Sequence, residues 1–179
     1  EGNIVDLPAV MPDGNEPYEA DYTVNVHNVT FTVDGEVYYG PTETAYNAPI
    51  AVPSVPTKNG YVFAAWKDAD GKQPSDYAGM PDKDLVFEVV WTANSNVGYV
   101  LNVYEMGTDG TYPAEDKPTA VYSFNDGIVG DDRTITPVVP TGFTLDVESS
   151  VTPEKSVLTG KIPATGTLVL KAYYARDQY

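Results

Sequence analysis

The sequence predicts a β-rich fold with little helix, arranged as small modules in tandem. Its 14 Tyr, together with abundant Val and Thr, favour pleated sheets, and its 15 Gly and 15 Pro favour turns. Short segments alternate apolar with polar residues, which is typical of strands with one buried face. The chain also resembles itself at long intervals, which indicates repeated modules. At 179 residues it is long enough for two small modules and the remnant of another.

The first complete module opens with a hairpin. In the segment NVTFTVDGEVYY, Val29, Phe31 and Val33 alternate with threonines, so they share one face of a strand. Asp34 and Gly35 follow as a turn dipeptide that reverses the chain into the second half of the segment. We therefore expect two antiparallel strands joined by a tight turn, with the three apolar residues in the core.

The same module closes with a second apolar strand. A proline-rich stretch, APIAVPSVPTKNG, and an aromatic segment, YVFAAW, come before it. In MPDKDLVFEVVW, apolar side chains fall at every second position of the strand. The residues predicted to face the core are Leu85, Phe87, Val89 and Trp91.

The last part of the chain, here called the third block, repeats the plan of the first complete module. The interval from Gly60 to Pro81 is repeated there between Gly142 and a proline, and KIPATGTLVLKAYY matches GMPDKDLVFEVVW. One additional residue in the turn before the closing strand shifts its apolar pattern. The residues predicted to face inward in this strand are Leu168, Leu170, Ala172 and Tyr174.

The start of the chain matches the end of a module. In MPDGNEPYEADYTVN, Tyr22 follows Pro12 at the same interval as the closing tryptophan of the next module follows its proline. The predicted organisation is a C-terminal remnant of a preceding repeat at residues 1–24, followed by modules at 25–95 and 97–179. Helix content stays open in two segments, TETAYNAPIAV and FNDGIVGDD, which fit short helices or loops.

Charge and cysteine content exclude several classes of function. Ten basic residues against 26 acidic ones give a net charge of −16. Such a surface repels nucleic-acid phosphates and anionic lipid headgroups, so neither nucleic acid nor membrane is expected as a partner. The absence of cysteine excludes thiol nucleophiles, disulfides and cysteine zinc sites. No apolar run approaches the ~20 residues of a membrane-spanning helix.

The residue patterns predict no catalytic residue, no metal site and no cofactor. His27 is the only histidine, and we expect it on the surface or in a linker. Neither a G-x-S-x-G nucleophile elbow nor a phosphate-binding loop occurs. The loop Asp68-x-Asp70-Gly71 is a fragment of a calcium-binding pattern that lacks its distal glutamate, so we expect a plain turn there. The protein is therefore predicted not to be an enzyme.

Tyrosines supply the only candidate binding residues. Aromatic residues at strand spacing are expected in the cores. Tyr38, Tyr39 and Tyr77 fit that spacing less clearly, as do Tyr112 and Tyr173. If the protein stacks on sugars, the first three of these are the predicted ligand contacts.

One motif resembles a known family. PTKNGYVFAAWKDADGK, with its closing MPDKDLVFEVVW, resembles the Listeria–Bacteroides repeat, the internalin-type B repeat of bacterial surface proteins, over residues 25–94. Ala65 stands where that family usually has glycine. The residues that match the family pattern are Gly60, Tyr61, Phe63 and Trp66.

The third block departs from this pattern, because it lacks the tryptophan. Residues 98–175, with GFTLDVESSVTPEKSVLTGKI, are more similar to the mucin-binding-protein repeats of Firmicute surface proteins. In such Gram-positive surface domains, lysine–asparagine isopeptide crosslinks are known. Lys171 is flanked by apolar residues on both sides, but the strand alternation predicts that it points outward, away from the core.

Both resemblances imply a β-rich α+β fold of β-grasp-like modules, each a curved sheet crossed by a short helix or an irregular segment. They imply a secreted protein of the Gram-positive cell surface or cell wall, whose repeats act as an extended stalk or spacer. The alternative is an adhesion module that binds a glycan or a host protein. The expected partners are neighbouring repeats of the same chain and, in the alternative, that host ligand.

Overall fold

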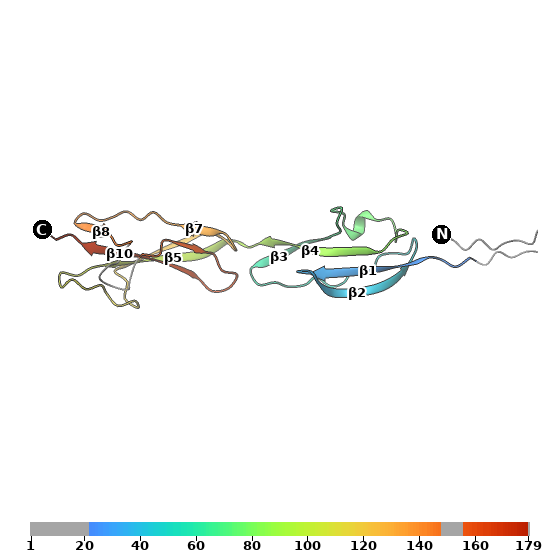
Figure 1. Ribbon diagram of the computed structural model, residues 1–179, viewed down its shortest axis with the longest axis horizontal. Helices are drawn as coiled ribbons and strands as arrows, with labels where there is room; N and C mark the ends of the chain where they lie inside the picture. The colour runs from blue at the N-terminus through green and yellow to red at the C-terminus, as the bar shows by residue number, and fades with distance from the viewer. Residues whose placement is uncertain (1–21, 148–155, 179) are drawn as a thin grey trace, which may run out of the picture. The chain divides into compact units, whose positions relative to one another are not determined.

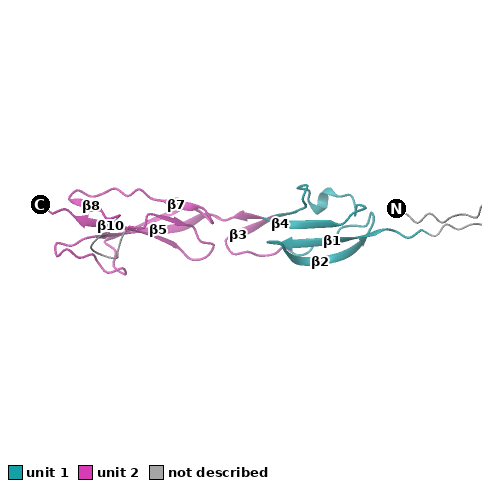
Figure 2. Cartoon of the chain, viewed as in Figure 1, with its two compact units in different colours: residues 1–54, 65–90 teal, residues 55–64, 91–179 magenta. Residues whose placement is uncertain are grey.

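The computed structural model describes residues 22–147 and 156–178, and the chain divides into two compact units (Figures 1 and 2). The first unit comprises residues 1–54 and 65–90, and the second comprises residues 55–64 and 91–179. The repeat remnant expected at residues 1–24 lies outside the described residues except for its last three. The module limits at 25–95 and 97–179 stay a prediction.

Four strands form the first sheet: β1 (Val26–Val33), β2 (Glu36–Ala45), β3 (Tyr61–Lys67) and β4 (Leu85–Ala93). Their order is β2-β1-β4-β3, and the division between the two units falls within β3 and β4. β1 is antiparallel to β2 and parallel to β4. Asp34 and Gly35 join β1 to β2 with positive φ angles of 52° and 83°, so the predicted hairpin and its turn are confirmed.

The second unit has a sheet of β5 (Ser95–Glu105), β6 (Ala120–Ile128), β8 (Phe143–Leu145) and β10 (Leu168–Arg176). Its order is β6-β5-β10-β8, again with an antiparallel hairpin and a parallel central pair. Two short strands, β7 (Asp132–Thr134) and β9 (Thr159–Lys161), pair separately. The two sheets therefore share one strand order, as the sequence repeats predict.

The described residues contain no α-helix, so the expectation of an α+β fold is wrong for this part of the chain. A 3-10 helix, η1 (Pro74–Asp76), is the helical element that is described. In the two undecided segments, TETA completes β2 and FNDGI completes β6. Alternating threonines suit a strand, and Pro49 and Pro53 then remove helical N–H donors from the following segment. No helix in the described ranges is long and apolar enough to cross a membrane.

The core of the first unit follows the predicted alternation. Phe31 is fully buried, and its ring stacks on that of Phe87 at 5.3 Å and meets Trp66 edge-on at 5.1 Å. Val29, Leu85 and Val89 are buried beside them. Trp91, at the far end of β4, is half-buried. Adjacent parallel strands thus place the apolar faces predicted for β1 and β4 on the same side of the sheet.

The core of the second unit confirms the predicted shift in β10. Leu170, Ala172 and Tyr174 are buried against the residues of β5. Tyr173 is buried as well, although it points to the opposite face of the strand. Its ring stacks on Tyr104 at 4.6 Å and meets Tyr112, from the loop after β5, at 5.1 Å. That loop covers the outer face of β10, which strand alternation alone does not reveal.

Candidate functional site

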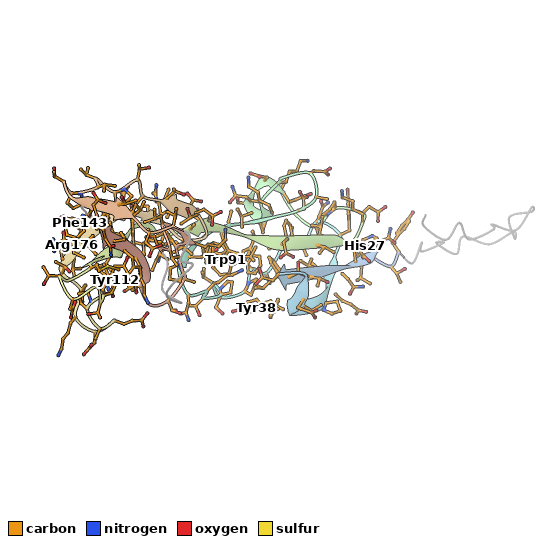
Figure 3. The ribbon with its side chains drawn as sticks, turned by 60° about the vertical axis from the view of Figure 1, so that its left-hand side comes forward. His27, Tyr38, Trp91, Tyr112, Phe143 and Arg176 are labelled. Atoms are coloured by element: carbon orange, nitrogen blue, oxygen red, sulfur yellow. The ribbon has the colours of Figure 1, made fainter. Side chains whose placement is uncertain are left out.

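Tyr38 and Tyr39 lie side by side on β2 and are 42% and 41% exposed. The pairing of β1 with β2 shifts register here, because Phe31 is paired with Tyr39 whereas Thr32 is paired with Val37. Tyr38 is the additional residue of this bulge, and such a bulge re-aims its side chain. The Tyr38 ring lies 5.9 Å from that of Trp66, and Figure 3 shows the side chain. The Tyr39 ring lies 6.2 Å from that of Phe31. The rings of Tyr38 and Tyr39 therefore both contact the aromatic core, and each keeps an exposed edge.

Tyr77 lies on a different element, directly after η1. Its ring meets Phe87 edge-on at 6.1 Å, and the ammonium of Lys72 lies 5.4 Å from its centre. Its hydroxyl donates a hydrogen bond to Asp68. Tyr77 is therefore half-buried, and its contacts lie within its own unit. The other two predicted ligand contacts, Tyr38 and Tyr39, lie at the bulge of β2.

Asp68 organises the loop that contains the calcium-like fragment. One carboxylate oxygen accepts the backbone N–H groups of Asp70, at 3.0 Å, and Lys72, at 2.8 Å, while the other accepts the Tyr77 hydroxyl. The bond from Tyr77, and then the backbone bonds, lower the pKa of Asp68. The same bond raises the pKa of Tyr77 to about 12. The expected turn is confirmed, and its carboxylate is used by the loop itself.

Replacing Asp68 with asparagine is expected to move the ionisation of Tyr77 back towards its ordinary pKa of 10.0. The folded-state pKa is raised, so the bond stabilises the fold fully below pH 10 and loses this contribution as the pH rises towards 12. An NMR titration of isotope-labelled tyrosine measures the shift directly. Asp70→Asn is the matched control, because Asp70 makes no bond to the hydroxyl; an equal effect of both changes would contradict the assignment.

A shallow apolar groove of about 420 Å³ lies in the second unit, formed by residues 55–59, residues 61–63 and Trp91. The ammonium of Lys58 lies over two rings of this groove, 5.3 Å from the centre of Tyr61 and 5.8 Å from that of Trp91. The indole N–H of Trp91 is buried and has no hydrogen-bond partner among the described residues. Strand alternation predicted Trp91 in a core. It could not identify Lys58 as the partner of Trp91, because cation–π contacts do not recur at a fixed spacing along a sequence.

Two comparisons with known proteins find similarity to this chain. The family model described as the Listeria-Bacteroides repeat domain matches residues 27–87. Residues 27–87 form a Listeria–Bacteroides repeat domain. The chain is also 32% identical over 89 residues to Internalin H of Listeria monocytogenes serovar 1/2a. This similarity covers 48% of the chain and 16% of Internalin H, so the chain corresponds to a small part of that protein.

The Listeria–Bacteroides repeat domain contains nearly all of β1, all of β2 and β3 and the first three residues of β4, together with all three predicted tyrosines. Domains of this kind occur in internalin-like bacterial surface proteins, and the family is typically non-catalytic. Ala65, where the family usually has glycine, lies within β3 in an ordinary strand conformation. The substitution thus leaves the strand intact.

His27 was expected on the surface or in a linker; it lies within β1 at the start of the repeat domain, with its side chain partly exposed, so it is not a linker residue. Its Nε2 lies 2.8 Å from a carboxylate oxygen of Asp82, and its Nδ1 lies 3.6 Å from Asp84. Asn25 donates a second bond to Asp82 at 3.1 Å. The bonds from His27 and Asn25 lower the pKa of Asp82. The described residues contain no cluster of side chains that could hold a metal ion.

Lys171 lies on β10, beyond the matched repeat domain. Its side chain points away from Leu170 and Ala172, as predicted, and its ammonium pairs with Glu115 at 2.5 Å. This bond raises the pKa of Lys171. The amine therefore stays protonated at neutral pH, which disfavours the nucleophilic amine that an isopeptide crosslink requires.

Proposed function

We propose that this chain is a non-catalytic repeat region of a bacterial cell-surface protein that acts as an extended stalk or spacer. The observation that supports it most directly is the shared strand order of the two sheets, each with an antiparallel hairpin and a parallel central pair. Repeated modules of one fold build length without adding a new site. The net charge of −16 disfavours collapse of one module onto another.

The modules are proposed to be β-grasp-like. The second sheet supports this, because its two central strands, β5 and β10, are parallel and each is flanked by an antiparallel partner. In the first sheet, an irregular segment between β2 and β3 takes the place of a crossing helix. The second module is proposed, on the motif of residues 98–175 alone, to be related to mucin-binding repeats.

The alternative is an adhesion module that binds a glycan or a host protein. Two observations favour it: the exposed edges of Tyr38 and Tyr39, and the groove around Trp91 with its unsatisfied indole N–H. Aromatic rings with adjacent hydrogen-bonding groups are the usual surface for such ligands. In both proposals the protein is displayed outside the cell, and neighbouring repeats of the same chain are its partners.

A screen of immobilised glycans and mucins decides between the two proposals. For a spacer we expect no retention of the chain, and the triple variant Tyr38→Ala, Tyr39→Ala, Tyr77→Ala behaves identically. Tyr122→Ala is the matched control, because this tyrosine is exposed on β6 of the second unit. Retention that is lost in the triple variant and kept in the control would overturn the spacer and establish the adhesion module.

A further inference from the structure

A hydrogen-bonded corner occurs inside the second unit, and it has two halves. Its tail half is the turn of residues 58–61, whose Gly60 carbonyl accepts the N–H of Asn94 at 2.8 Å. Its head half is the turn at Val129, whose N–H donates to the Asn94 carbonyl at 3.0 Å, with the neighbouring turn at Ala164. The halves are in close contact, because a Cβ on Gly60 would lie 2.8 Å from the Cα of Ala164.

A second tail half ends the second unit. Phe143 donates to the Pro140 carbonyl at 3.2 Å, as Tyr61 donates to Lys58 at 3.1 Å in the first tail half. The glycine of each turn has a left-handed backbone, with φ of 83° at Gly142 and 78° at Gly60. The N–H of Asp177 donates to the Gly142 carbonyl at 3.0 Å, which is the bond that Asn94 makes to Gly60.

A second head half lies in the first unit. Tyr46 donates to the Asn25 carbonyl at 2.8 Å, as Val129 donates to Asn94. The next residue, Asn47, donates to the carbonyl of buried Met80 at 2.8 Å, and Gly130 makes the same bond to Ile162 at 2.9 Å. Asn47 and Gly130 share a left-handed backbone, with φ of 64° and 88°. Asp82, two residues after Met80, therefore takes the place of Ala164, two residues after Ile162.

Both additional halves lack the cover that completes the corner, as far as the described residues go. A Cβ on Gly142 would meet nothing within 4 Å, whereas Gly60 is packed against Ala164. Tyr46 is 48% exposed, whereas Val129, its counterpart, is 6% exposed. Each half thus has the backbone geometry of the corner without the contact that the complete corner makes.

We propose that the tail half at Gly142 docks the head half of a module of the first unit's kind, joined directly after Asp177. This inference rests on the proposed repeat array and names the contact by which it is built. Asp177 then takes the position of Asn25, with its N–H on Gly142 and its carbonyl accepting the N–H of Tyr46 in the following module.

The side chains at the two halves bear on the strength of this contact. In the head half of the first unit, Asn25 donates to Asp82 at 3.1 Å. Asp177 would stand in the place of Asn25 and bring a second carboxylate to Asp82, which weakens the contact. The preceding residue, Arg176, is used within its own unit: its guanidinium lies 4.8 Å from the centre of Phe143 (Figure 3), and its Nε donates to the Met106 carbonyl at 3.3 Å. The backbone correspondence therefore identifies this head half, and an amide at position 177 should strengthen its docking.

The test is a tandem chain in which residues 22–177 are followed directly by a second copy of residues 26–178. We expect hydrogen exchange at the amide of Asp177 to slow about tenfold in the tandem relative to the single chain, because docking covers its bond to Gly142. Asp177→Asn in the first copy is expected to slow exchange at this amide further, because an amide side chain can donate to Asp82 as Asn25 does. Adding Asp82→Ala in the second copy should remove this additional protection.

Two controls make the outcome decisive. Asp177→Asn in the single chain measures any change that comes from the bond of Thr144 to this side chain alone, and Asp116→Asn removes the same charge at an exposed site of the same unit. Equal exchange in tandem and single chains overturns the docking, and protection that Asp177→Asn fails to increase overturns the place assigned to Asp82. Either failure leaves the spacer intact, since the spacer is tested separately by the glycan screen.

Discussion

Replacing Phe31 with alanine is expected to unfold the first unit and leave the second folded. The side chain is fully buried, and its ring contacts Tyr39, Trp66 and Phe87. Removing a buried phenylalanine costs about 3–5 kcal/mol of unfolding free energy. A module of this size has little more than that in total, because small domains bury a modest fraction of their surface.

The position of the two tryptophans allows each unit to be followed separately. Trp66 belongs to the first unit and Trp91 to the second, so Trp91→Phe and Trp66→Phe backgrounds report on one unit each. Denaturant titration of Phe31→Ala should remove the Trp66 transition and preserve that of Trp91. Val86→Ala is the matched control, because Val86 precedes Phe87 on β4 but faces solvent. A decrease in unfolding free energy of less than about 1 kcal/mol, measured at Trp66, would show that Phe31 is not central to the core.

Gly60→Ala is expected to destabilise the second unit by about 2–5 kcal/mol, well beyond the effect of Gly142→Ala. Both glycines have a left-handed backbone, with φ of 78° and 83°, where alanine costs roughly 1–2 kcal/mol. At Gly60 the new Cβ would also lie 2.8 Å from both the Cα and the Cβ of Ala164. Overpacking of this kind typically adds about 1–3 kcal/mol. A Cβ at Gly142 would have open space, so Gly142→Ala is destabilised by the backbone conformation alone.

Denaturant titration followed at Trp91 measures this difference, with Gly142→Ala as the internal control for backbone strain. Ala164→Gly in the Gly60→Ala background should restore part of the loss, because it removes one of the two close carbon atoms. The other is backbone, so the rescue stays incomplete. Equal losses in the two glycine variants would mean that the turn of residues 58–61 does not pack on Ala164.

The candidate sites were only partly predictable. The exposure of Tyr38 and Tyr39 depends on a bulge in the pairing of β1 with β2, and neither strand shows that bulge in its own apolar pattern. The contact of Lys58 with Trp91 joins residues from two separate segments. The contact of His27 with Asp82 was not predicted, because Asp82 comes from a distant segment. Such contacts have no period along the chain.

The sequence by itself determined the strands around Phe31, Phe87 and Leu170, their inward faces and the repetition of one plan. Alternation at Phe31 and Phe87 and the shift at Leu170 are local properties, because a pleated strand sends every second side chain to the same face. Only the tertiary structure decided that Tyr173 is buried and that the second unit contains a closed corner at Gly60. Both depend on distant segments, the loop with Tyr112 in one case and the turn with Ala164 in the other. Whether a residue is buried depends on which segments pack over it, and the fold of the whole unit determines which segments these are.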